Sequence, residues 1–185
     1  LRDSVFAENG VYTRDGRVLK DVHGYGWLTV GEGLQKSSNI VMAKLSDRVE
    51  PTTQYEYLRA FGFGSPTAVR YPSESGGVLR RPGDWSRYSQ ASLAIGYEIS
   101  VTPLQMLMAY GALANGGVLM QPLLVREVRS RDNVTIENFQ SRPVRRVIPE
   151  RVADELRGVL TDVVATGTAQ AESAKAMGSP RGYYM

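Results

Sequence analysis

Helix and strand signals follow one another along this chain without a regular strand–helix–strand alternation, and this order limits the fold class more than any other feature. A parallel sheet needs that alternation, because a crossover segment must return the chain before each new strand. Helices and strands in mixed order are instead typical of helices packed on an antiparallel sheet. We therefore expect a chain of the α/β (α+β) class, with helices packed on an antiparallel sheet.

Three segments carry clear helix signals. Residues 29–32, Thr-Val-Gly-Glu, fit a capping box, which places the start of a short helix there. Thr102 is a good N-cap and Pro103 suits the first helical position, so a second helix begins here and ends at the Asn-Gly of residues 115–116. The longest helix should cover residues 150–165, with a buried face formed by Val152, Leu156, Val159, Leu160 and Val163.

Shorter elements fill the chain between these helices. We expect helices at residues 40–45, 53–61, 86–93 and 167–174, and a hairpin of two strands at 123–129 and 134–139. Residues 63–84 are rich in proline and glycine and should form a long irregular stretch, of the kind that usually serves a function. No repeat or linker divides the sequence, and its 185 residues suit one domain or a piece of one.

Composition excludes several kinds of chemistry. The chain has no cysteine and one histidine, His23, which excludes disulfides, thiol catalysis and a multi-histidine metal centre and argues against a Ser–His triad. We expect His23 to be a surface or hydrogen-bonding residue, and we expect neither a metal nor a cofactor. A net charge of +3 is too small to indicate nucleic-acid binding. No apolar run approaches the roughly 18 residues of a membrane-spanning helix.

One short segment offers side chains suited to catalysis. Ser37 and Asn39 lie two residues apart, at a break between two helical segments. A hydroxyl there can relay a proton, and a carboxamide can donate to a substrate carbonyl while it accepts from an ammonium group. Ser-x-Asn also suits a helix cap. The residues alone leave both interpretations open, a catalytic pair and a helix cap.

A longer pattern surrounds this segment. It consists of residues 26–40, the run Gly-Tyr-x-Ile-Ser-Val-Thr-Pro-Leu-Gln at 96–105 and the run Tyr-Gly-Ala-Leu-Ala-Asn-Gly-Gly at 110–117. In this order the segments resemble the transpeptidase domain of class B penicillin-binding proteins, of the division and sporulation type. Residues 162–169 resemble the helix end that precedes the last active-site strand of that family. The resemblance covers nearly the whole chain and implies the penicillin-binding transpeptidase fold, which is similar to that of serine β-lactamases.

Three motifs carry the chemistry of that family, namely Ser-x-x-Lys, Ser-x-Asn and Lys-Thr-Gly. The second falls on Ser37 and Asn39, so the resemblance favours the catalytic interpretation of this pair. No serine of the chain has a lysine three residues later, and neither Lys-Thr-Gly nor Lys-Ser-Gly occurs. We expect the nucleophile segment upstream of Leu1 and the Lys-Thr-Gly strand downstream of Met185. Residues 1–185 would then form a partial, incomplete transpeptidase domain.

The resemblance implies a serine-type D-Ala-D-Ala transpeptidase as the parent protein, which cross-links stem peptides through an acyl-enzyme. In it Ser37 would relay protons, and Asn39 would orient the lysine and hold the substrate's backbone amide; no further substrate-binding residue is assigned. The partners implied are peptidoglycan stem peptides, β-lactams and glycan-polymerising, division or elongation proteins, with no nucleic acid. The resemblance also implies an extracytoplasmic location, with an N-terminal helix as the membrane anchor.

Two alternatives on the same fold stay open. One is a hydrolase or sensor that recognises β-lactams, and the other is a non-catalytic scaffold in a cell-wall assembly. Intact Ser-x-x-Lys and Lys-Thr-Gly motifs in the flanking sequence would favour an enzyme over the scaffold. The 185 residues alone should be inactive, because they contain no activated nucleophile.

Overall fold

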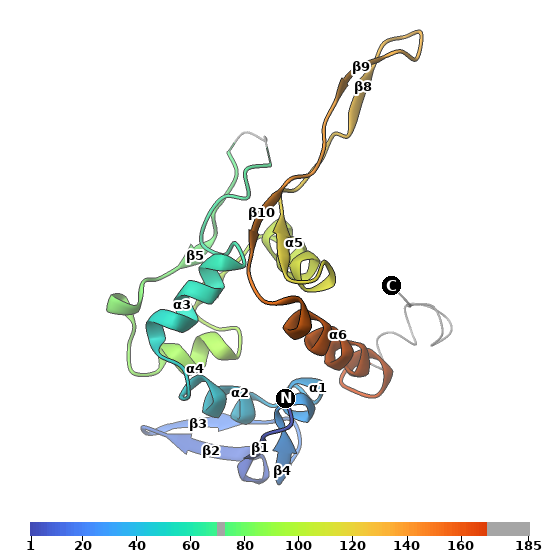
Figure 1. Cartoon of the computed structure of the whole chain (residues 1–185). Coiled ribbons are helices and arrows are strands. Elements are labelled where there is room, and N and C mark those ends of the chain that lie inside the picture. The colour runs from blue at the N-terminus through green and yellow to red at the C-terminus, as the bar shows by residue number, and fades with distance from the viewer. Residues whose placement is uncertain (70–72, 170–185) are drawn as a thin grey trace. The chain divides into compact units, whose positions relative to one another are not determined.

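The computed structural model describes residues 1–69 and 73–169 (Figure 1). These residues fall into two compact units. The described part of the first unit consists of residues 1–50, 85–97 and 155–169. The second unit takes up residues 51–84 and 98–154. The units are therefore interleaved in the sequence, and no single linker separates them.

The first unit begins with two antiparallel strand pairs. β1 (Ser4–Phe6) pairs with β4 (Trp27–Thr29), and β2 (Val11–Arg14) pairs with β3 (Arg17–Lys20) across a turn at residues 15–16. A 3-10 turn, η1 (Glu8–Gly10), lies between the pairs in sequence. The helices of this unit are α1 (Val30–Gln35), α2 (Asn39–Ser46), α4 (Ser89–Ala94) and residues 155–165 of α6 (Glu150–Ala165).

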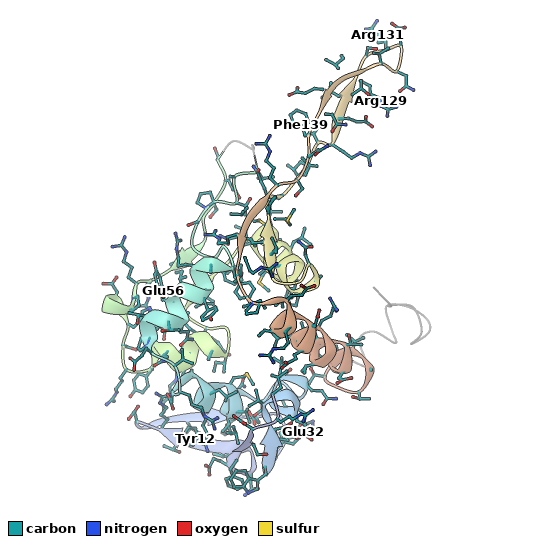
Figure 2. All side chains as sticks on the ribbon, in the orientation of Figure 1. Tyr12, Glu32, Glu56, Arg129, Arg131 and Phe139 are labelled. Atoms are coloured by element: carbon teal, nitrogen blue, oxygen red, sulfur yellow. The ribbon has the colours of Figure 1, made fainter. Side chains whose placement is uncertain are left out.

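The capping box predicted at the start of α1 is confirmed. The hydroxyl of Thr29 accepts the backbone N–H of Glu32 at 3.1 Å, and the Glu32 carboxylate accepts the backbone N–H of Thr29 at 2.8 Å. These hydrogen bonds from Thr29 hold the pKa of the Glu32 carboxyl below its usual range, because they favour its charged form. Glu32 is labelled in Figure 2.

α2 forms the centre of the first unit. Its residues Ile40, Val41 and Ala43 have no exposed surface, and Val41 belongs to a core cluster with Val5, Ala7 and Leu28. α2 also packs against α4, where Leu93 is buried. A helix buried in this way fixes the position of the residues that immediately precede it.

Gly33 allows α1 and α2 to approach closely, and its replacement should be costly. A Cβ at residue 33 would lie 2.5 Å from Cγ1 of Val41. We expect Gly33→Ala to destabilise the protein by about 1–3 kcal/mol, the usual range for overpacking. Gly31→Ala is the matched control, because a Cβ there would have its nearest contact, Val159, at 3.6 Å. Urea unfolding checks the pair, and equal stability of the two variants would contradict the close approach.

The described residues of the second unit form two complete helices and three antiparallel strand pairs. Its helices are α3 (Pro51–Ala60) and α5 (Pro103–Ala114), followed in sequence by the first turn of α6 and accompanied by a 3-10 turn, η2 (Pro82–Asp84). The strands pair as β5 (Val78–Leu79) with β6 (Ile99–Ser100), β7 (Val118–Met120) with β10 (Pro143–Arg146), and β8 (Glu127–Arg129) with β9 (Thr135–Asn138). Figure 2 shows the β8–β9 hairpin with Arg129 and Arg131 near its tip.

Gln105 organises the irregular stretch of the second unit. Its side chain is fully buried, and its amide nitrogen donates to the carbonyl oxygens of Ser65 and Gly76, each at 2.8 Å. The amide oxygen accepts the backbone N–H of Thr102 at 2.8 Å, which completes a capping box at the start of α5. The predicted start of α5 at Thr102 and Pro103 is thus confirmed. Gln105 both caps this helix and binds the loop that precedes it.

The mixed helix-and-strand class is confirmed, and so are the bounds of α6. Within the described residues, the strands form five separate antiparallel pairs. α4 begins at Ser89 instead of residue 86, because residues 86–89 form a turn in which the Ser89 backbone N–H donates to the Ser86 carbonyl at 3.1 Å. The predicted face of α6 is only half-buried, and Ala153 is its fully buried residue. The strand expected at 123–129 pairs only from residue 127 onward.

Two remaining expectations concern the C-terminal segment and membrane insertion. The helix expected at residues 167–174 lies mostly outside the described residues, and residues 168–169 form a turn. In the part of the chain that the structure describes, no helix is both long enough and apolar enough to cross a membrane.

Candidate functional site

The predicted pair, Ser37 and Asn39, lies in a tight turn that joins α1 to α2. The backbone N–H of Ser37 donates to the Leu34 carbonyl at 3.1 Å, and that of Ser38 donates to the Gly33 carbonyl at 2.8 Å. Ser37 has a φ of 52°, in the left-handed region that a residue with a side chain adopts at a cost. The turn is therefore held in an unfavourable backbone conformation by its surroundings.

The three side chains of the turn point to different environments. Ser38 is fully buried and is the N-cap of α2, since its hydroxyl accepts the Val41 backbone N–H at 3.1 Å. Ser37 is exposed and Asn39 is half-buried. Helix capping, one of the two interpretations of the sequence, thus falls on the middle residue. It does not account for the hydroxyl of Ser37 or the carboxamide of Asn39.

The Ser37 hydroxyl contacts residues 166–169, the described segment that follows α6. Its Oγ lies 3.1 Å from Oγ1 of Thr168, and either hydroxyl can be the donor. Beside it, the amide of Gln35 donates to Oγ1 of Thr166 at 2.5 Å. Two parts of the chain that are 131 residues apart are joined here, and Thr168 extends the site beyond the predicted pair.

The Asn39 carboxamide is oriented by one hydrogen bond. Its Nδ2 donates to the backbone carbonyl of Lys20, at the end of β3, at 3.0 Å. The carboxamide oxygen accepts no hydrogen bond from any residue that the structure describes. An amide has two donors and one acceptor oxygen, so the second N–H and the oxygen of Asn39 remain for a reacting group.

Lys20 and its neighbour Asp21 are site residues that the sequence did not reveal. The carboxylate of Asp21 accepts the Ser38 hydroxyl at 2.5 Å and the Ile40 backbone N–H at 3.1 Å. Neither residue belongs to a local motif, and both reach the turn only because β3 lies beside α2.

His23 is exposed, as expected. In the described ranges, no group of acidic or histidine side chains could hold a metal ion.

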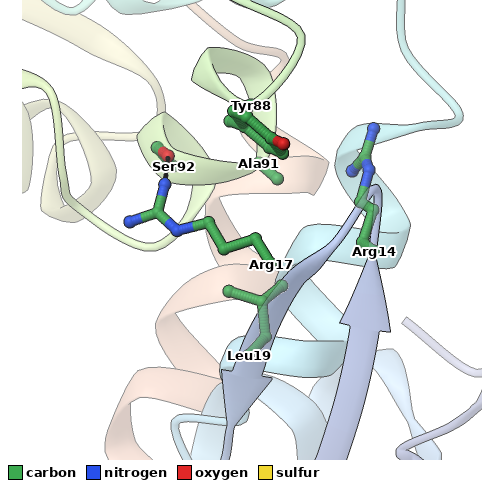
Figure 3. Close-up of a pocket in the computed structure, with 6 residues that line it drawn as sticks. All are labelled: Arg14, Arg17, Leu19, Tyr88, Ala91 and Ser92. Atoms are coloured by element: carbon green, nitrogen blue, oxygen red, sulfur yellow. Dashed lines mark hydrogen bonds between the residues drawn. The ribbon is translucent and has the colours of Figure 1, made fainter.

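The first unit also contains a small hollow away from the turn. It is lined by Arg14, Arg17, Leu19, Tyr88, Ala91 and Ser92 (Figure 3). The guanidinium of Arg17 donates to the Ser92 hydroxyl at 3.3 Å, and that of Arg14 pairs with Asp47 at 2.6 Å. A volume of about 10 Å³ suits a single water molecule and excludes a peptide or an antibiotic. The candidate site is therefore the turn and not this hollow.

An α+β chain that presents Ser-x-Asn at the start of a buried helix fits the penicillin-recognising class of proteins. A family model described as the penicillin binding protein transpeptidase domain matches residues 2–182. The chain therefore belongs to the transpeptidase domain family of penicillin-binding proteins.

Individual relatives agree with this assignment. The chain is 34% identical to penicillin-binding protein PbpB of Mycolicibacterium smegmatis, over 88% of this chain and 25% of that protein. It is 32% identical to the probable peptidoglycan D,D-transpeptidase PbpC of Pseudomonas aeruginosa, over 84% of this chain and 26% of that protein. It thus spans about a quarter of the length of these curated relatives.

A solved structure supports the fold. Penicillin-binding protein 3 of Mycobacterium tuberculosis, complexed with aztreonam, superposes with a TM-score of 0.74 at 34% identity. The match covers 84% of this chain and 35% of that one. The predicted fold class is confirmed by this likeness.

Proposed function

We propose that this chain supplies the Ser-x-Asn element, Ser37 and Asn39, of a peptidoglycan D,D-transpeptidase. The observation that carries the proposal is the arrangement within the turn. Ser38 caps α2, whereas the side chains on either side of it take no part in capping that helix. The chain's family includes proteins named as peptidoglycan D,D-transpeptidases, which gives this pair a matching chemistry.

In the first step, the nucleophile is the serine of a Ser-x-x-Lys motif, which does not occur within residues 1–185. Its oxygen forms a bond to the carbonyl carbon between the two D-alanines of a stem peptide, and the carbon–nitrogen bond breaks. The departing amine takes up the proton that the serine gives away. Ser37 relays this proton, since a hydroxyl can accept one hydrogen bond while it donates another.

In the second step, an amine of another stem peptide attacks the ester carbon. A carbon–nitrogen bond forms, the bond to the serine oxygen breaks, and the serine regains a proton through the same relay. The oxygen of Asn39 orients the ammonium of the motif lysine, and its carboxamide holds the substrate's backbone amide. The hydrogen bond from Asn39 to the Lys20 carbonyl keeps the carboxamide in place for both steps.

The proposal extends to inhibitors and to location. β-Lactams acylate the same serine, because they resemble the D-Ala-D-Ala end of the stem peptide. The site works outside the cytoplasmic membrane, where stem peptides are cross-linked. An N-terminal membrane anchor and a glycan-polymerising, division or elongation partner would belong to the full-length protein.

Labelling of the full-length protein with a fluorescent penicillin tests the proposal. We expect a covalent adduct that survives denaturation, persists after free label is removed, and is prevented by unlabelled penicillin. A folded protein that takes up no label would contradict the proposal and favour the scaffold. An adduct that forms and is rapidly hydrolysed would favour the hydrolase.

A further inference from the structure

Asp21 holds the turn that carries the candidate pair. Its two carboxylate oxygens act on different groups: Oδ2 accepts the Ser38 hydroxyl at 2.5 Å, and Oδ1 accepts the Ile40 backbone N–H at 3.1 Å. One side chain thus binds the residue between Ser37 and Asn39 and the residue just after them. Hydrogen bonds to an ionised acceptor are roughly twice as strong as those between neutral groups.

The Ser38 hydroxyl depends on this carboxylate. It already accepts the Val41 backbone N–H at 3.1 Å, so its own proton needs an acceptor in a site with no exposed surface. A buried hydroxyl without an acceptor is costly. Asp21 therefore fixes the position of the Ser38 side chain. Ser38 is joined by peptide bonds to Ser37 and Asn39, so its position affects both.

The turn needs such a restraint because of its backbone conformation. Ser37 has a left-handed φ of 52°, which is unfavourable for a residue other than glycine and persists only when the surroundings hold it. The adjacent residue, Lys20, binds the Asn39 carboxamide through its carbonyl. Consecutive residues at the end of β3 thus restrain Ser38, Asn39 and Ile40.

We propose that Asp21 is a positioning residue of the transpeptidase site, which acts through Ser38 to present the Ser37 hydroxyl and the Asn39 carboxamide. This inference rests on the proposed function. Asp21 touches neither substrate nor nucleophile in this role. Its effect should appear in the rate of the chemical step and not in the binding of the antibiotic.

The test measures acylation of the full-length protein by a penicillin, resolved into the dissociation constant of the first complex and the acylation rate constant. Asp21→Asn keeps the size of the side chain and one acceptor oxygen, but its nitrogen cannot accept the Ser38 hydroxyl. We expect the acylation rate constant to fall about 10-fold, with the dissociation constant nearly unchanged.

Two further variants separate positioning from general stability. Asp47→Asn, which removes a carboxylate that pairs with Arg14 at 2.6 Å at the other end of α2, should leave the acylation rate constant unchanged. Ser38→Ala should also lower the acylation rate constant, and its effect should add only partly to that of Asp21→Asn, because both variants change the contact between residues 21 and 38. Ser38→Ala also covers the case in which Asp21→Asn does not fold.

The outcomes distinguish the two proposals. If the wild-type protein is not acylated, the proposed function fails. If it is acylated, and folded Asp21→Asn and Ser38→Ala proteins react at the wild-type rate, Asp21 has only a structural role and the inference is overturned.

Discussion

Replacing Asn39 by alanine in the full-length protein should slow its acylation by a penicillin by about 10²-fold. The carboxamide is expected to make a hydrogen bond to the motif lysine and another to the substrate, and bonds to charged groups are worth about 1.5–3 kcal/mol each. Its existing bond to the Lys20 carbonyl at 3.0 Å would also be lost, which frees the end of the turn. Stopped-flow or gel-based acylation kinetics measure the change.

Asn138→Ala is the matched control for this variant. Asn138 is an exposed asparagine in β9, in the second unit. Its loss should leave acylation at the wild-type rate. Asn39→Ala protein that is folded and reacts as fast as Asn138→Ala protein would show that Asn39 has no part in the chemistry.

The 185-residue chain by itself should not form a covalent adduct with a penicillin. A serine hydroxyl is a weak nucleophile unless a neighbouring base activates it, and no serine in this chain is followed by a lysine at the motif position. We expect labelling at the level of the heat-denatured full-length protein when both are incubated with the same fluorescent penicillin. The helix content of the isolated chain, measured by circular dichroism, shows whether the chain was folded in the labelling assay.

Labelling of the isolated chain would overturn this expectation. It would place a reactive serine within residues 1–185 and make the absent motifs unnecessary. Competition with unlabelled penicillin separates a specific adduct from nonspecific acylation of surface groups.

The helices were the part of the fold that the sequence predicted best. The capping boxes at Thr29 and Thr102 depend on hydrogen bonds between residues three apart, so local sequence contains all the partners. The long helix α6 has the predicted bounds for a similar reason, since its apolar residues recur at helical spacing. Local sequence was therefore enough to predict where these helices lie, and often to predict the residue at which a helix begins.

Pairing between distant segments was not predictable in this way. β7 and β10 pair although more than twenty residues separate them, and neither was expected as a strand. The two units are each assembled from separated pieces of the sequence, so no linker marks their boundary. Strand pairs and unit boundaries of this kind depend on contacts between residues that are far apart in the sequence, and no local pattern records those contacts.

The candidate site shows the same division. Ser37 and Asn39 could be predicted from a short motif and a family resemblance. The roles of Ser38 as the cap and of Asp21 as its acceptor could not, because they follow from the position of β3 beside α2. The left-handed φ of Ser37 likewise has no signal in the sequence, since glycine or asparagine is the usual choice there.

The most direct test of the central claim is to map the acylated residue by mass spectrometry after digestion of penicillin-treated full-length protein. The account predicts one penicilloyl adduct, on the serine of a Ser-x-x-Lys sequence, and unmodified peptides for all of residues 1–185, including the one that contains Ser37. An adduct on Ser37, or on any other serine of these 185 residues, would contradict it.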